Sequence, residues 1–137
     1  MNLIGIQSYQ VDDVWPDIEH LILKPLERTG SIKDYSLDDL KQMIKSREMQ
    51  LWIAADQKPV AAFLTRILVF PKRKVFSQFL AGAEDHTMDL WLDLRKTFID
   101  YAKANDCQAI RTGGRKGWAR KLNVTGQEMT LFTEELS

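Results

Sequence analysis

The stretch QLWIAADQKPVAAFLTRILVFPKRKVFSQFLA, residues 50–81, decides the fold. Its pattern predicts strands over 50–55, 60–70 and 74–81, separated by turns at 56–59 and 71–72. Strands that follow one another this closely pair as an antiparallel meander. Both alternating sets of the long strand are largely apolar: Phe63, Ile67 and Val69 in one, Leu64, Leu68 and Phe70 in the other. We therefore expect helices to cover both faces of the sheet.

Upstream of the meander, the pattern predicts a strand and two helices. Leu3–Tyr9 alternates weakly and is expected to be a first strand. A helix follows with Asp12 or Asp13 as its N-cap, and Pro25 is expected to end or kink it. A second helix is expected to begin after Ser36, which with the acid three residues later has the pattern of a capping box.

Downstream, helical spacing of apolar residues predicts one long, well-buried helix over Met88–Asn105, capped by Thr87. A strand over Cys107–Thr112, a short helix over Lys116–Leu122 and a last strand over Gln127–Thr133 complete the chain. The expected order is β-α-α-β-β-β-α-β-α-β, an α/β fold of the α+β kind with a mixed sheet.

Composition restricts the class of protein. The chain has 137 residues, 19 Lys and Arg against 19 Asp and Glu, and one cysteine. This length and the lack of a composition break predict one domain over residues 1–137. The balanced charge argues against a protein that is basic throughout. A single cysteine cannot form an internal disulfide, and the longest apolar run is too short to span a bilayer, so we expect an intracellular protein without a membrane partner.

Four segments carry a resemblance to a known family. They are Gln50-Leu51-Trp52-Ile53, Phe70-Pro71-Lys72-Arg73-Lys74, Trp91-Leu92-Asp93-Leu94 and Gly114-Arg115-Lys116-Gly117-Trp118-Ala119-Arg120-Lys121-Leu122. With the element order, they make the chain similar to short GNAT-like (N-acetyltransferase-like) proteins encoded by tailed bacteriophages and prophages. The resemblance implies a GNAT-like fold, a location in the bacterial host cytoplasm or in the virion, and contacts with other phage or virion proteins.

In active GNAT enzymes, backbone N–H groups between the fourth strand and the long helix hold the pyrophosphate of the acyl-CoA. The resemblance places Ala81, Gly82 and Ala83 at this position. Only one glycine is present there, and Glu84 and Asp85 follow directly. Negative charges beside a polyanion each cost on the order of 1 kcal/mol, so the sequence disfavours ordinary CoA binding.

The family's chemistry also uses a proton acceptor and a proton donor, often a Glu on the meander and a Tyr on the later short helix. No acidic residue stands between Lys58 and Ala83, and no tyrosine follows Tyr101. Glu84 is the nearest carboxylate that can serve as a base. We expect no metal site, because the adjacent side chains of Glu84, Asp85 and His86 seldom converge on one ion.

The cations cluster in two windows without acids. One holds Arg66 and Lys72 to Lys74, and the other holds Arg111, Arg115, Lys116, Arg120 and Lys121. The second window, with Trp118 as a stacking surface, is a candidate anion or nucleic-acid patch. The plainer interpretation is a solvated basic rim whose stems pack over Trp118.

Three functions follow from these observations. The main interpretation is a non-catalytic protein that acts through protein contacts in the virion or its assembly, with no cofactor and with a homo-oligomer as one form of contact. The first alternative is an N-acetyltransferase that uses acetyl-CoA through a degenerate loop. The second alternative is a nucleic-acid-binding module built on the basic windows.

Overall fold

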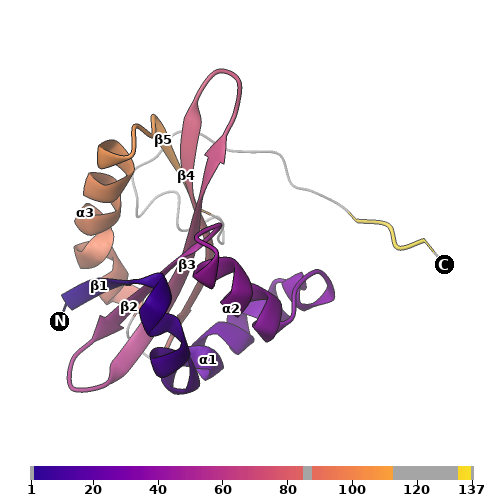
Figure 1. Ribbon diagram of the computed structural model, residues 1–137, viewed down its shortest axis with the longest axis vertical. Helices are drawn as coiled ribbons and strands as arrows, with labels where there is room; N and C mark the ends of the chain where they lie inside the picture. Colours follow the sequence, from indigo (N-terminus) through magenta and orange to yellow (C-terminus); the bar gives the residue numbers. More distant parts are fainter. Residues whose placement is uncertain (1, 85–87, 113–132, 137) are drawn as a thin grey trace.

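A computed structural model describes residues 2–84, 88–112 and 133–136, with the side chains of 88–93 excluded. Five strands form one sheet in the order β1-β2-β3-β4-β5 (Figure 1). The strands are β1 (Asn2–Ile6), β2 (Gln50–Ala55), β3 (Pro59–Val69), β4 (Lys74–Ala83) and β5 (Ala109–Thr112). The helices are α1 (Val11–Arg28), α2 (Leu37–Lys45) and α3 (Met88–Ala104), and short 3-10 turns occupy Ser8–Gln10 and Ser31–Lys33.

The register confirms the antiparallel meander. β1 to β4 pair antiparallel in chain order, and β5 joins β4 in parallel after the crossover through α3. The bounds of β2 match the prediction, and those of β3 differ by one residue at each end. The predicted strand Leu3–Tyr9 is wrong at its C-terminal end, because the chain turns at Ser8–Gln10 and enters α1. The expected short helix Lys116–Leu122 lies outside the described residues, as does the expected last strand except Thr133, which is not in a strand.

Helices α1 and α2 cover one face of the sheet. Their buried side chains, among them Ile18, Ile22, Leu26 and Leu40, form a core with Leu64 of β3. The predicted capping box of α2 is confirmed. The backbone N–H of Asp39 donates to the Ser36 hydroxyl at 3.0 Å, and the N–H of Ser36 donates to the Asp39 carboxylate at 2.9 Å. This exchange satisfies N–H groups that a helix start leaves without partners.

Pro25 does not end α1, which is one of the two outcomes expected from sequence. The helix continues through it to Arg28. A proline has no N–H, so it leaves the carbonyl four residues earlier, that of Leu21, without its helical donor. That carbonyl lies against β4 at Gly82, where a Cβ atom would overlap its oxygen. The helix backbone therefore approaches the sheet at a point where the sheet has no side chain.

Helix α3 covers the opposite face (Figure 1). Phe98 is fully buried, and its ring lies 5.3 Å from Trp52, 5.4 Å from Phe63 and 5.8 Å from Phe76, centroid to centroid. Tyr101, one turn further, packs edge-on against Trp52 at 4.9 Å. The sheet is thus covered on both faces, as the two apolar alternation sets of β3 predict. In the described part of the chain, α1, α2 and α3 all lack an apolar stretch long enough to cross a bilayer.

Candidate active site

An extra residue interrupts β4 opposite β3. Leu64 pairs with Leu80, whereas the next residue, Thr65, pairs with Gln78, so Phe79 has no partner in the ladder. This is a β-bulge, in which two residues of one strand oppose one residue of its neighbour. Phe79 and Leu80, although adjacent in sequence, both pack into the core under α1 and α2. The bulge therefore reverses the alternation of β4 at this point.

β5 pairs with β4 in parallel on the side away from β3. The described register runs from Val75 opposite Ala109 to Gln78 opposite Thr112. β4 continues for five more residues, to Ala83.

Two side chains pack directly on the bulge residue. The Tyr35 ring meets the Phe79 ring edge-on at 5.4 Å, and the Arg66 guanidinium carbon lies 4.8 Å from the Phe79 centroid. The Arg66 Nε atom is buried and makes no hydrogen bond within the described chain. Arg66 thus stacks on an aromatic ring in a half-buried position.

Sequence reasoning missed Tyr35, which directly precedes the N-cap Ser36. A hydrophobic residue at that position commonly packs against the fourth helical residue, here Leu40, and both belong to the same core. That pattern was the available signal.

The residues expected at the CoA loop lie in a strand. Ala81, Gly82 and Ala83 are the end of β4 and pair with Phe63, Ala62 and Ala61 of β3. The prediction that β4 ends at Ala81 is therefore wrong by two residues. It failed because glycine usually marks a turn, whereas Gly82 is selected here by the close approach of Leu21 and Pro25.

Glu84 follows β4 directly, and its N–H donates to the carbonyl of Val60 at 2.9 Å. Its carboxylate lies 4.0 Å from Nε2 of His20, a residue of α1 that is distant in sequence, and both side chains are largely solvent-accessible. Glu84 lies five positions after Phe79, a path of roughly 16 Å along a strand. The candidate base is therefore far from the bulge. Among the described residues, no three His, Cys, Asp or Glu side chains gather as a metal site would require.

The structure describes one member of the basic window 111–121. The Arg111 guanidinium carbon lies 5.4 Å from the ring centroid of Phe70, near the tip of the β3–β4 hairpin. Arg115, Lys116, Arg120 and Lys121 lie outside the described residues, so the nucleic-acid patch stays a prediction. In the first window, Lys74 is engaged internally, because its Nζ donates to the carbonyl of Asn105 at 2.6 Å.

Comparison with solved structures identifies the fold, whereas comparison by sequence finds no match. No family model matches the chain, and neither does any curated protein. Among solved structures, a probable acetyltransferase superposes with a TM-score of 0.74 at 14% identity, covering 100% of this chain and 99% of that chain.

Two further acetyltransferases show the same likeness. An aminoglycoside acetyltransferase from an uncultured soil metagenomic sample, in complex with sisomicin, has a TM-score of 0.71 at 10% identity, with 99% and 96% coverage of this chain and its own. A ribosomal-protein-alanine N-acetyltransferase from Brucella melitensis biovar Abortus 2308 has a TM-score of 0.68 at 9% identity, with 99% and 100% coverage. The described part of the chain has a GNAT-like fold, with a mixed five-strand sheet and helices as in these acetyltransferase structures.

Proposed function

We propose that the protein is an acyl-CoA-dependent N-acetyltransferase. The observation that carries this proposal is the bulge at Phe79, inside a fold shared along its whole length with acetyltransferases. In active GNAT enzymes, the fourth and fifth strands splay near this position to admit the pantetheine arm. The sequence alone favours a non-catalytic protein of the virion, whereas we propose an enzyme. That role and the phage origin stay predictions.

The described residues fit acetyl-CoA in part. In this proposal, the edge of β4 away from β3, from Phe79 to Ala83, supplies backbone donors and acceptors to an amide-containing arm. Ala81 and Ala83 keep this part of the strand slender. Glu84, at the end of the strand, counts against the phosphates, and we expect it to weaken the binding of the cofactor without preventing it.

When bound, acetyl-CoA supplies the acyl thioester for transfer. The nitrogen of the acceptor amine forms the new C–N bond, the C–S bond breaks, and the amine proton passes to solvent as the thiolate gains one. Tyr35 and Arg66, whose side chains pack on Phe79, are neither carboxylate nor imidazole. We therefore assign them to positioning the acceptor and propose that the amine reacts as its free base.

Calorimetry and thermal unfolding with acetyl-CoA at millimolar concentration test the proposal. We expect heat of binding and a rise in the melting temperature, because a ligand that binds only the folded state stabilises it by mass action. Release of free thiol then tests turnover, with sisomicin and a peptide with N-terminal alanine as acceptors. An absence of both heat and thermal stabilisation would contradict the proposal.

Glu84→Gln tests where the cofactor lies. Removing one negative charge close to the phosphates should tighten acetyl-CoA binding about fivefold, and this gain should fade in high salt. Glu48→Gln, a change at an exposed residue before β2, is the matched control and should leave the affinity unchanged. Equal affinity of the Glu84→Gln variant and the parent protein would place the phosphates elsewhere.

A further inference from the structure

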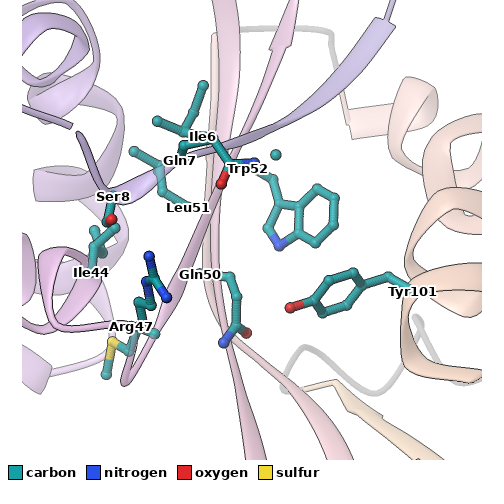
Figure 2. Close-up of a pocket in the computed structure, with 11 residues that line it drawn as sticks. Ile6, Gln7, Ser8, Ile44, Arg47, Gln50, Leu51, Trp52 and Tyr101 are labelled. Carbon is teal, nitrogen blue, oxygen red and sulfur yellow. The ribbon is translucent and has the colours of Figure 1, made fainter. Parts of the chain in front are cut away.

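A cavity of about 380 Å³ opens where β1 and β2 meet the end of α2 (Figure 2). Its walls come from the end of β1 and the turn after it, the segment that joins α2 to β2, the start of β2, and Tyr101 of α3. This volume is within the range of small-molecule sites. The lining combines apolar side chains, such as Ile6, Ile44 and Leu51, with a few polar groups. Such a combination suits a small molecule with an apolar body and a polar end.

The side-chain amide of Gln50 uses its oxygen in an internal hydrogen bond and leaves its NH₂ group available. The indole N–H of Trp52 donates to the Thr65 hydroxyl at 2.9 Å, and that hydroxyl donates to Oε1 of Gln50 at 3.0 Å. The hydroxyl proton of Thr65 is thus donated to Gln50, and the side-chain oxygen of Gln50 has a partner within the protein. The Nε2 group of Gln50 makes no hydrogen bond with the described residues, so it remains a donor for a ligand.

Tyr101 supplies a second donor from the opposite side. Figure 2 shows its hydroxyl directed toward Gln50. Burial raises the pKa of the Tyr101 phenol above its usual 10.0, and the nearby Cys107 thiol adds to this rise. The hydroxyl is therefore protonated at neutral pH.

Arg47 is the one charged side chain among the described residues that line the cavity. Its backbone has a φ of 70°, the left-handed region that residues other than glycine seldom adopt. A glycine at this position would remove the strain, yet the chain carries an arginine. Its guanidinium forms no ion pair with the part of the chain that the structure describes. Arg47 follows the C-cap of α2, and the N–H of Glu48 donates to the carbonyl of Met43 at 3.0 Å, so the left-handed backbone at Arg47 ends the helix.

We propose that this cavity binds a small carboxylate with an apolar or aromatic body. Arg47 pairs with the carboxylate, and the Gln50 amide and the Tyr101 hydroxyl donate to it. The apolar body lies against Trp52. Each of the three polar groups is a donor, and the cavity lining as described contains no carboxylate that would compete for them, so an anion is favoured over a cation or a neutral amide.

The site is separate from the proposed acetyl-CoA site. Gln50, Thr65 and Gln78 are register partners on three successive strands. At about 4.8 Å per strand, Gln50 in the cavity lies roughly 10 Å from Gln78, the residue of β4 before the bulge. The inference goes beyond the proposed function and does not depend on it.

Benzoate is the probe, and benzamide is its neutral counterpart. In ¹H–¹⁵N NMR spectra, we expect benzoate to shift the Gln50 side-chain amide and the Trp52 indole N–H with saturation, and benzamide to shift them weakly or not at all. A Trp52→Phe variant assigns the indole signal. Benzoate that leaves both signals in place, or equal shifts from benzamide, would overturn the proposal.

Arg47→Gly separates binding from folding. It removes the cation and relieves the left-handed backbone, so the variant should melt at the same or a higher temperature while its benzoate affinity falls about tenfold or more. Arg28→Gln, at the exposed end of α1, removes one positive charge elsewhere and should leave the affinity unchanged. Tyr101→Phe keeps the ring and should weaken binding several-fold. Retention of full affinity by Arg47→Gly would refute the role of the guanidinium.

Discussion

At Gly82, the backbone of α1 lies so close to β4 that no side chain would fit between them. A Cβ on Gly82 would overlap the Leu21 carbonyl oxygen and meet the Pro25 ring at 3.2 Å. Both obstacles belong to rigid parts of a helix, so the helix must move. We expect Gly82→Ala to lower the free energy of unfolding by about 3 kcal/mol, at the upper end for overpacking. Urea denaturation measures this loss.

Gly30→Ala is the control at the same scale. Gly30 has a φ of 77° and nothing within 4 Å of an added Cβ. Its replacement carries only the backbone cost of the left-handed region, about 1 kcal/mol. If Gly82→Ala cost no more than Gly30→Ala, the tight contact with Leu21 would be refuted.

At the scale of the element, an ion cluster joins α1 to α2. The Asp12 carboxylate lies 3.0 Å from Nζ of Lys45 and 3.1 Å from Nζ of Lys41. The hydrogen bonds from Lys45 and then Lys41 hold the pKa of Asp12 below its usual 3.8. A lowered folded-state pKa gives stability that is present above pH 3.8 and is lost as the pH falls through the lower value. We expect Asp12→Asn to be less stable than the parent at pH 6, and the two to converge near pH 2.

Thermal unfolding between pH 2 and 6 measures this convergence. The difference at pH 6 should be small and should shrink further in 1 M salt, because the cluster is exposed and screened. Asp13→Asn is the control, since it removes a charge from the same helical turn and the described chain gives Asp13 no ion-pair partner. A pH-independent difference for Asp12→Asn would show that the lysines contribute nothing through its charge.

At the scale of the whole molecule, one sheet serves two cores. Leu26 of α1 is buried against one face of the sheet, and Phe98 of α3 is buried against the opposite face. Because the strands are common to both cores, loss of one should destabilise the other. We expect Leu26→Ala to cost about 2–5 kcal/mol and Phe98→Ala about 3–5 kcal/mol, each within a single transition.

Coincidence of the far-UV circular dichroism and tryptophan fluorescence transitions tests this cooperativity. Ile32→Ala is the control, because Ile32 is 46% exposed, and it should change stability by no more than about 0.5 kcal/mol. Separate transitions in either core variant would mean that the faces unfold independently.

Much of this architecture could be predicted from local patterns. The bounds of β2, the capping box at Ser36 and the helices on both faces of the meander follow from periodicity and turn chemistry. The path of α1 through Pro25 could not be predicted, because its cause is a tertiary contact with Gly82. Taken singly, Pro25 is expected to interrupt a helix and Gly82 to interrupt a strand. In the structure, the two residues lie in one contact between α1 and β4.

The candidate sites were harder to predict for the same reason. Phe79 is marked as a bulge only by the register of two strands, and the sequence gives no sign of an unpaired residue there. Tyr35 and Arg66 reach it from segments 31 residues apart in the chain. Gln50 and Tyr101 come together only through the packing of α3 on the sheet. Spacing within one segment cannot report such convergence.

The bulge at Phe79 also determines how the chain tolerates insertions and deletions. Before it, the residues of β4 facing α3 have even numbers, such as Phe76, and after it they have odd numbers, such as Ala81. Loss of one of the two bulge residues would therefore restore a regular ladder and leave both faces of the strand unchanged, with Gly82 still facing Leu21. Loss of one residue elsewhere in β4 would instead exchange the two faces over part of the strand. In a comparison of homologous sequences, a one-residue gap in β4 is therefore expected at the bulge and not elsewhere in the strand.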